Sequence, residues 1–236
     1  MSRKSVLLGI GIFMLLVGCA AGGLVALLHH EPEFYRRSTV PPGDVRVKGS
    51  VEFEQRFTQL LGDLQGDQRW VASFTDEQLN CYFEEGFRRS RLDETMLPEG
   101  ISSPRIGIEP DKMRLAFRYG SGVWSTIITI DLRMWLAPKE PNVVALELLS
   151  FHAGSLPITA QSLLEQVSEV GRRRSIDVSW YRHQGNPVAL LRFQADRERP
   201  TVQLQLLELQ QGQIMISGRS VEASPLRAML SPAPGL

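Results

Sequence analysis

Side chains that could carry acid–base or metal chemistry are few in this 236-residue chain, and none falls in a recognised motif. Asp131 and Glu147 both lie in predicted strands and could face each other, although a surface cross-strand position explains such an isolated pair better. His152 and His183 fall near predicted strand ends without a motif partner. The sequence lacks a nucleophile elbow, an H-E-x-x-H pair, a Walker loop and a dinucleotide fingerprint. We therefore predict no catalytic residues, no metal site and no cofactor.

The densest group of ligand-recognising residue types is Trp180–His183, whose rings and arginine could stack on bases or bind a protein partner. Ile176, Val178 and Trp180 nevertheless alternate toward a core, so packing explains the tryptophan at least as well. The run Arg172–Arg174 closes a predicted helix, where positive charge stabilises the helix dipole. Because 26 basic residues balance 26 acidic ones, we predict no nucleic-acid partner.

The elements that would position these residues follow an apolar N-terminal segment. Residues Val6–Leu28 carry no charge, and a helix of this length covers ~34 Å, enough for a hydrocarbon core of ~30 Å. We predict that residues 1–28 form an uncleaved signal anchor, a single-pass transmembrane helix. The alternatives are a lipoprotein signal acylated at Cys19 and a cleaved secretory signal. The apolar run Ala20–Leu28 argues against the first, and the length of the segment argues against the second.

The basic residues that flank this segment do not decide its orientation by themselves. They are Arg3 and Lys4 before it, and Arg36, Arg37, Arg46 and Lys48 after it. The bare count favours a cytoplasmic domain, but long domains translocate largely regardless of charge. We expect the protein in the cytoplasmic (inner) membrane, with its N-terminus inside and its domain outside the cytoplasm.

Beyond the anchor, the composition predicts a linker, one domain and a tail. The prolines of residues 29–49 argue against regular structure in this juxtamembrane linker. Within it, Phe34–Arg37 suits a membrane interface as well as it suits an ordinary linker. The domain covers residues 50–222, and residues 223–236 form a flexible tail.

Apolar spacing within the domain predicts amphipathic helices. Residues 50–64 repeat apolar side chains at intervals of three and four. Thr75 and Gln78 form a capping box that begins a second helix, over residues 75–89. A third helix is predicted over residues 157–170.

Period-two alternation predicts the strands. One alternating run is unusually long, which suggests a large, curved antiparallel sheet. The last third of the chain is expected to form a meander of hairpins. The predicted fold class is α+β, with the curved sheet packed against two to three amphipathic helices. The predicted strands cover residues 70–74, 113–119, 124–136 and 143–151, with hairpins over 176–193 and 202–217.

The apolar side of this predicted sheet suggests a ligand-binding surface. A curled sheet could leave a groove for a lipid or another apolar ligand, or the same side chains could pack a closed core. The candidate lining residues are Tyr82, Phe83, Met113, Leu115, Phe117, Trp124, Ile128 and Ile130. On the opposite side, Ile127 and Trp135 interrupt the polar alternation, which suggests an exposed surface for a protein partner.

The order of these parts and three segments resemble a known family. The segments are FTDEQLNCYF, then VVALELLSFHAGSLPITAQSLLEQV, in which a strand passes through Gly154-Ser-Leu-Pro157 into a helix, and finally LQLLELQQGQIMISG. The chain resembles the YpmS-like family of bacterial single-span membrane proteins, whose outer domains have no established activity. More distantly, it is similar to tubular lipid-binding folds of the bacterial envelope. The resemblance implies an envelope protein and transfers no site residues.

Three functional hypotheses follow. We expect first a non-catalytic, membrane-anchored domain outside the cytoplasm that binds a lipid or another apolar ligand. The alternative is an envelope protein–protein interaction or assembly factor. The third hypothesis is an enzyme without a recognisable motif, since a fold alone does not establish a function.

Overall fold

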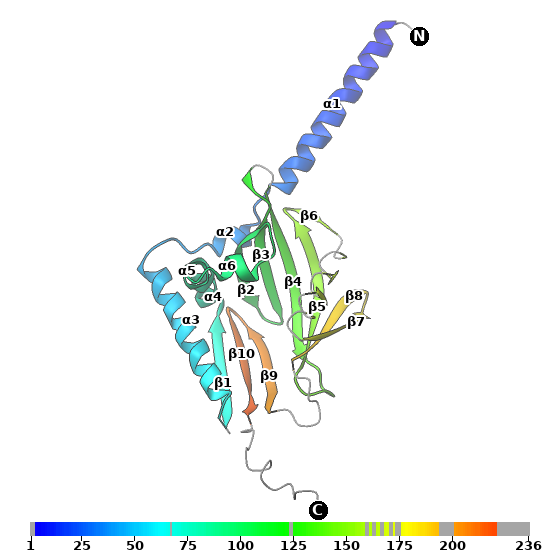
Figure 1. Cartoon of the computed structure of the whole chain (residues 1–236). Coiled ribbons are helices and arrows are strands. Elements are labelled where there is room, and N and C mark those ends of the chain that lie inside the picture. The colour runs from blue at the N-terminus through cyan, green and yellow to red at the C-terminus, as the bar shows by residue number, and fades with distance from the viewer. Residues whose placement is uncertain are drawn as a thin grey trace, which may run out of the picture.

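The computed structural model describes residues 3–66, 68–122, 125–158, 176–193 and 201–220, together with positions 161, 164, 165, 168, 169 and 172; side chains are described from residue 14 onward, residue 21 excepted. An N-terminal helix projects from a body with one large and one small antiparallel sheet (Figure 1). The predicted α+β class with a large antiparallel sheet is confirmed. The predicted tail, strand residue Trp124 and half of the positions of the predicted helix 157–170 lie outside the described residues; the described positions 161, 164, 165, 168 and 169 are helical, as predicted.

Helix α1 (Arg3–Leu28) confirms the predicted N-terminal helix. No charged residue follows Lys4 within it, and its described side chains are exposed until Leu28, so they do not pack on the domain. In the part of the chain that the structure describes, α1 is the one helix long and apolar enough to cross a membrane.

Two helices replace the predicted linker. Helix α2 (Glu33–Arg37) follows Pro32, and helix α3 (Asp44–Asp63) begins before the predicted start at Ser50. The prolines precede these helices rather than interrupt them, and Glu33 and Asp44 place negative charge in the two first turns. The absence of regular structure predicted for residues 29–49 is therefore wrong.

The second predicted helix is divided in two. Helix α4 (Asp76–Glu84) has the predicted capping box, in which the Gln78 N–H donates to Thr75 Oγ1 at 3.1 Å. The chain then bends at Glu85 and continues as α5 (Gly86–Arg89) and α6 (Leu92–Met96). A Cβ atom on Gly86 would lie 2.8 Å from the Tyr82 ring and 2.9 Å from the buried Ser50 Oγ of α3, so any other residue at the bend would force these neighbours to shift.

The large sheet is antiparallel, with strand order β2-β3-β4-β5-β8-β7 and the short β6 paired to β5. Strand β2 was not predicted, because a bulge at Ser102–Arg105 and the positive φ of Ser103 interrupt its alternation. The predicted alternating strands are confirmed, and Phe117 lies opposite Ile128. The bounds are β2 (Ile101–Glu109), β3 (Lys112–Tyr119), β4 (Thr126–Leu136), β5 (Val143–Ala153), β6 (Leu156–Pro157), β7 (Asp177–His183) and β8 (Asn186–Arg192).

The small sheet consists of β1 (Arg69–Thr75), β10 (Gln213–Ser220) and β9 (Val202–Gln210), in that order. The predicted continuous meander is therefore wrong, because the last hairpin pairs with β1 rather than with β7. Leu209 and Ile214 from this hairpin pack with Ile108 and Met113 of the large sheet. The apolar side chains of the hairpin thus join the two sheets in one core.

An asparagine bonds one edge strand of each sheet. Asn80 of α4 donates to Ile106 O at 2.7 Å and accepts from Ile106 N at 2.9 Å, on edge strand β2. Asn142 does the same for edge strand β9, where it donates to Val202 O and accepts from Leu204 N. At these positions each amide takes the place of a neighbouring strand and satisfies two backbone groups of the edge.

Candidate functional site

The end of α1 is bonded directly to the large sheet. The Ser155 N–H, in the turn between β5 and β6, donates to Leu27 O at 3.0 Å, and Thr126 Oγ1 of β4 donates to Leu28 O. The last carbonyl groups of a helix have no partner within the helix. Here the domain supplies those partners, so α1 and the sheet meet at a defined joint.

Gly154 makes this joint possible. Its φ of +58° lies in the left-handed region, and a Cβ atom there would lie 2.3 Å from Leu27 O and 2.6 Å from Leu28 O. Its N–H donates to Ile127 O at 2.7 Å, which ties the same turn to β4. A side chain at this position would push α1 away from the sheet.

An apolar surface of the large sheet begins at this joint. Leu28, the last residue of α1, packs against a buried cluster formed by Ile128, Ile130, Leu148 and Ala153. A second cluster, shared through Leu115, carries the surface on to the small sheet. We call this the apolar face. Its partly buried sheet residues are Leu115, Phe117, Leu132 and Phe151, and Leu28 of α1 and Leu164 pack against it.

Most of the predicted lining residues lie on the apolar face. Met113, Ile128 and Ile130 are buried in it, and Leu115 and Phe117 are partly buried. Phe83 of α4 reaches it at the small-sheet end. Two of the predicted residues are not placed there. Trp124 lies outside the described residues, and Tyr82 packs instead in an aromatic cluster with Phe53 and Phe87. The structure thus groups six of the eight candidates, and their binding of a ligand stays a prediction.

Helix α2 packs on the opposite side of the sheet, over Ala116 and Ile127, and we call this side the charged face. Ile127 is only 2% exposed because Tyr35 and Phe34 pack on it, so its predicted exposure is wrong. Burial raises the pKa of Tyr35, whose hydroxyl donates to Ser103 O at 3.0 Å. Trp135 stays partly exposed, with its ring centroid 6.5 Å from that of His183.

The two carboxylates singled out in the sequence are separately paired on this charged face. Arg114 Nε donates to Asp131 Oδ1 at 2.6 Å; burial alone would raise the pKa of Asp131, but these hydrogen bonds and the Arg114 charge lower it. The buried Glu147 accepts from Arg133 at 3.0 Å and from Asn186 at 2.9 Å. Each carboxylate is thus engaged by an arginine. Among the described residues, no three His, Cys, Asp or Glu side chains form a metal-binding group.

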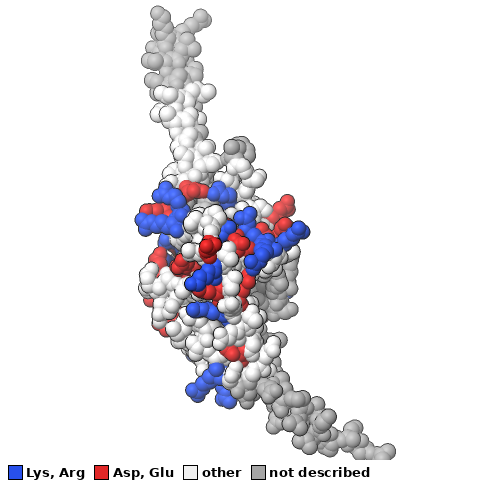
Figure 2. Space-filling view, turned by 90° about the vertical axis from the view of Figure 1, so that its left-hand side faces the viewer, with Lys and Arg blue, Asp and Glu red and all other residues white. Residues whose placement is uncertain are grey.

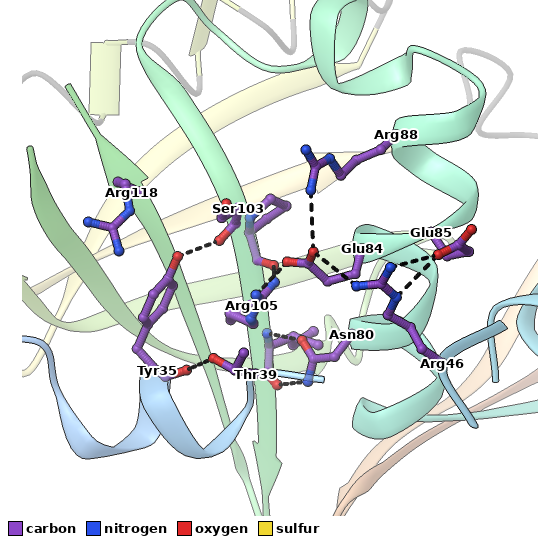
Figure 3. Close-up of polar contacts among 12 residues, drawn as sticks. Tyr35, Thr39, Arg46, Asn80, Glu84, Glu85, Arg88, Ser103, Arg105 and Arg118 are labelled. Atoms are coloured by element: carbon purple, nitrogen blue, oxygen red, sulfur yellow. Dashed lines mark hydrogen bonds and ion pairs between the residues drawn. The ribbon is translucent and has the colours of Figure 1, made fainter. Parts of the chain in front are cut away.

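A buried ion-pair network fastens α4 to the edge of the sheet (Figure 3). The Glu84 carboxylate contacts Arg105 of β2, Arg88 at 3.5 Å and Arg46 at 3.9 Å. Arg105 is 5% exposed and its guanidinium also lies 5.6 Å from the centre of the Tyr35 ring. On the side of the domain seen in Figure 2, basic and acidic side chains are intermixed, which agrees with this pairing.

Sequence reasoning missed this edge contact, although a signal was present. Asp76, Asn80 and Glu84 recur every four residues and so share one side of α4. Asp76 accepts from Ile108 N at 3.2 Å, Asn80 pairs with Ile106, and Glu84 pairs with Arg105. The polar side of α4 is thus the feature of the sequence that corresponds to its contact with edge strand β2.

A separate cavity of about 320 Å³ lies between α5, α6 and the start of β2. Phe83, Phe87 and Ile101 supply apolar walls, while Arg88 and three carboxylates supply polar ones. Phe83 is the one predicted lining residue that borders it. The cavity opens beside the Glu84 network and not onto the joint with α1.

Comparison with known proteins identifies no relative. No family model, no curated protein and no solved structure matches the chain. The resemblance to the YpmS-like family is therefore neither supported nor opposed, and it stays a prediction.

Proposed function

We propose that this protein is a non-catalytic, membrane-anchored lipid-binding domain. In this proposal α1 crosses the cytoplasmic membrane with its N-terminus inside, and the domain stands outside the cytoplasm. The apolar face then receives a hydrocarbon chain of a lipid from the same bilayer. The observation that carries the proposal is the packing of Leu28, the end of α1, against the apolar cluster that contains Ile128 and Ile130 of the sheet.

Covering the apolar face favours such a ligand. A chain drawn from the bilayer already has its methylenes out of water, so the gain comes from the apolar surface of the protein, at about 25 cal/mol per Å² removed from water. Leu115, Phe117 and Phe151 are only partly buried, so they keep apolar surface for contact. A lipid that enters beside Leu28 would move between two apolar surroundings without crossing water.

The pairing of the charged groups supports the non-catalytic part of the proposal. A general acid or base must reach its substrate, and Asp131 and Glu147 instead bind Arg114 and Arg133. The rival function, a protein-interaction or assembly factor, retains only Trp135 after the burial of Ile127. We therefore rank it second.

Native mass spectrometry of the detergent-extracted full chain tests the proposal. We expect a co-purifying lipid in the wild-type protein and about tenfold lower occupancy in Phe117→Ala, which corresponds to ~1.4 kcal/mol of lost contact. Phe57→Ala is the matched control, because Phe57 is exposed on α3 and does not belong to the apolar face. Absence of lipid from the wild-type protein, or equal loss in both variants, would contradict lipid binding at this face.

A further inference from the structure

We propose that the end of the large sheet around the α1 joint is a membrane-contact surface, which lies in the headgroup layer of a zwitterionic bilayer. The surface is formed by Tyr119 at the end of β3 and Ile158 just after β6, on the two sides of the joint. It rests on the membrane crossing by α1, which is part of the proposed function, but it does not require a lipid on the apolar face.

The chain from α1 to α2 gives the domain a fixed position at the joint. Leu27 and Leu28 are bonded to the sheet, and Glu31, shortly after them, pairs with Arg118 at 2.6 Å. Tyr35 follows, buried on the charged face. Contacts to the sheet thus recur every three or four residues, so no free linker separates the domain from the end of α1 between Leu27 and Tyr35.

Tyr119 and Ile158 lie beside the last turn of α1. Tyr119 pairs with Thr126, and Thr126 bonds to Leu28 O. Ile158 donates its N–H to Phe151 O at 3.0 Å and lies three residues beyond Ser155, which bonds to Leu27 O. Figure 1 shows the end of β3 and β6 at the base of α1. If α1 spans the bilayer, these positions come to its surface.

The chemistry of the two side chains suits that depth. Tyr119 is 52% exposed and Ile158 is 39% exposed, although both are large and apolar. Tyrosine rings are enriched at membrane–water interfaces, where the hydroxyl reaches water and the ring contacts hydrocarbon. Two of the nearby arginines are paired, Arg118 with Glu31 and Arg37 with Glu33, whereas Arg36 is exposed; a zwitterionic bilayer therefore tests the apolar contact without an attraction between Arg36 and anionic lipid.

Spin-label accessibility in phosphatidylcholine vesicles tests the surface with the full chain. A nitroxide is attached to cysteine at position 119, 158 or 71 in a Cys19→Ser background, where the remaining Cys81 is buried and the unsubstituted background measures its labelling. Val71 is the control because it is 67% exposed on β1, at the end of the domain away from α1 (Figure 1).

We expect a nickel chelate in water to collide several-fold less often with labels at 119 and 158 than with the label at 71. Equal collision rates at the three positions would overturn the membrane-contact surface.

The joint is tested by Gly154→Val and by the milder Thr126→Val, both of which should raise the nickel accessibility of labels 119 and 158. Unchanged accessibility in both variants would overturn the role of the joint. Lipid retention in detergent is measured separately, so failure here does not imply failure of lipid binding.

Discussion

The two faces of the large sheet differ in how they are covered. On the charged face, α2 buries Ile127, and each of Asp131, Glu147 and Arg105 has a partner of opposite charge. On the apolar face, Ile128, Ile130 and Leu148 are buried, whereas Leu115, Phe117 and Phe151 stay partly exposed, and the surface runs to the end of α1. Ion pairs and a short helix thus cover part of one face, while the other face combines a buried apolar cluster with partly exposed apolar side chains.

We expect the largest loss of stability from a change in the buried ion pair between Glu84 and Arg105, beside the charged face. Glu84→Gln would leave Arg105 buried without a counter-charge, and removal of one partner of a buried pair costs about 3–5 kcal/mol. Urea unfolding of the full chain in detergent measures this loss. Arg88→Ala is the control, because the exposed Arg88 is expected to contribute at most about 1 kcal/mol. Equal effects of the two changes would show that burial of Arg105 is unimportant.

Truncation of one aliphatic residue on each face compares how much each face contributes to the free energy of unfolding. Ile127→Ala removes a fully buried side chain and should cost about 3 kcal/mol in the free energy of unfolding. Leu115→Ala removes a partly buried one and should cost about 1–2 kcal/mol, since part of its surface already contacts solvent or ligand. If the order of the two losses were reversed in the same urea titration, the apolar face would be the more closed of the two.

A smaller, pH-dependent effect is expected from Asp131. Because Arg114 lowers the pKa of Asp131 below its ordinary 3.8 in the folded state, the ion pair stabilises the fold fully above that value. The stabilisation is lost as the pH falls through the lowered pKa. Asp131→Asn should therefore cost about 1.5 kcal/mol at pH 7, and the gap to wild type should narrow below pH 4. A gap that widens in acid would contradict the assigned direction.

Local signals made part of this fold predictable. The capping box of Thr75 and Gln78 needs only neighbouring residues, and the alternation through Met113, Leu115 and Phe117 directly reports a strand with one apolar side. The same alternation predicted which residues form most of the apolar face. These features follow from spacing along the chain, so no knowledge of distant contacts was required.

Other features depend on partners far along the chain. Ile127 was expected to be exposed because only the tertiary position of Tyr35, in a segment rich in proline, covers it. The pairing of β1 with β10 joins Trp70 to Gly218, and no local pattern selects that partner over β7. The joint with α1 depends likewise on Gly154 meeting Leu27 from the other end of the sequence.

Photocrosslinking in intact membranes tests the lipid-binding face most directly. A benzophenone amino acid replaces Phe117 on the apolar face, Trp135 on the charged face or the exposed Phe57 of α3. We expect mass spectrometry to show a phospholipid adduct at position 117 and none at the other two positions. A protein adduct at 135, with no lipid adduct at 117, would contradict lipid binding and favour the interaction factor.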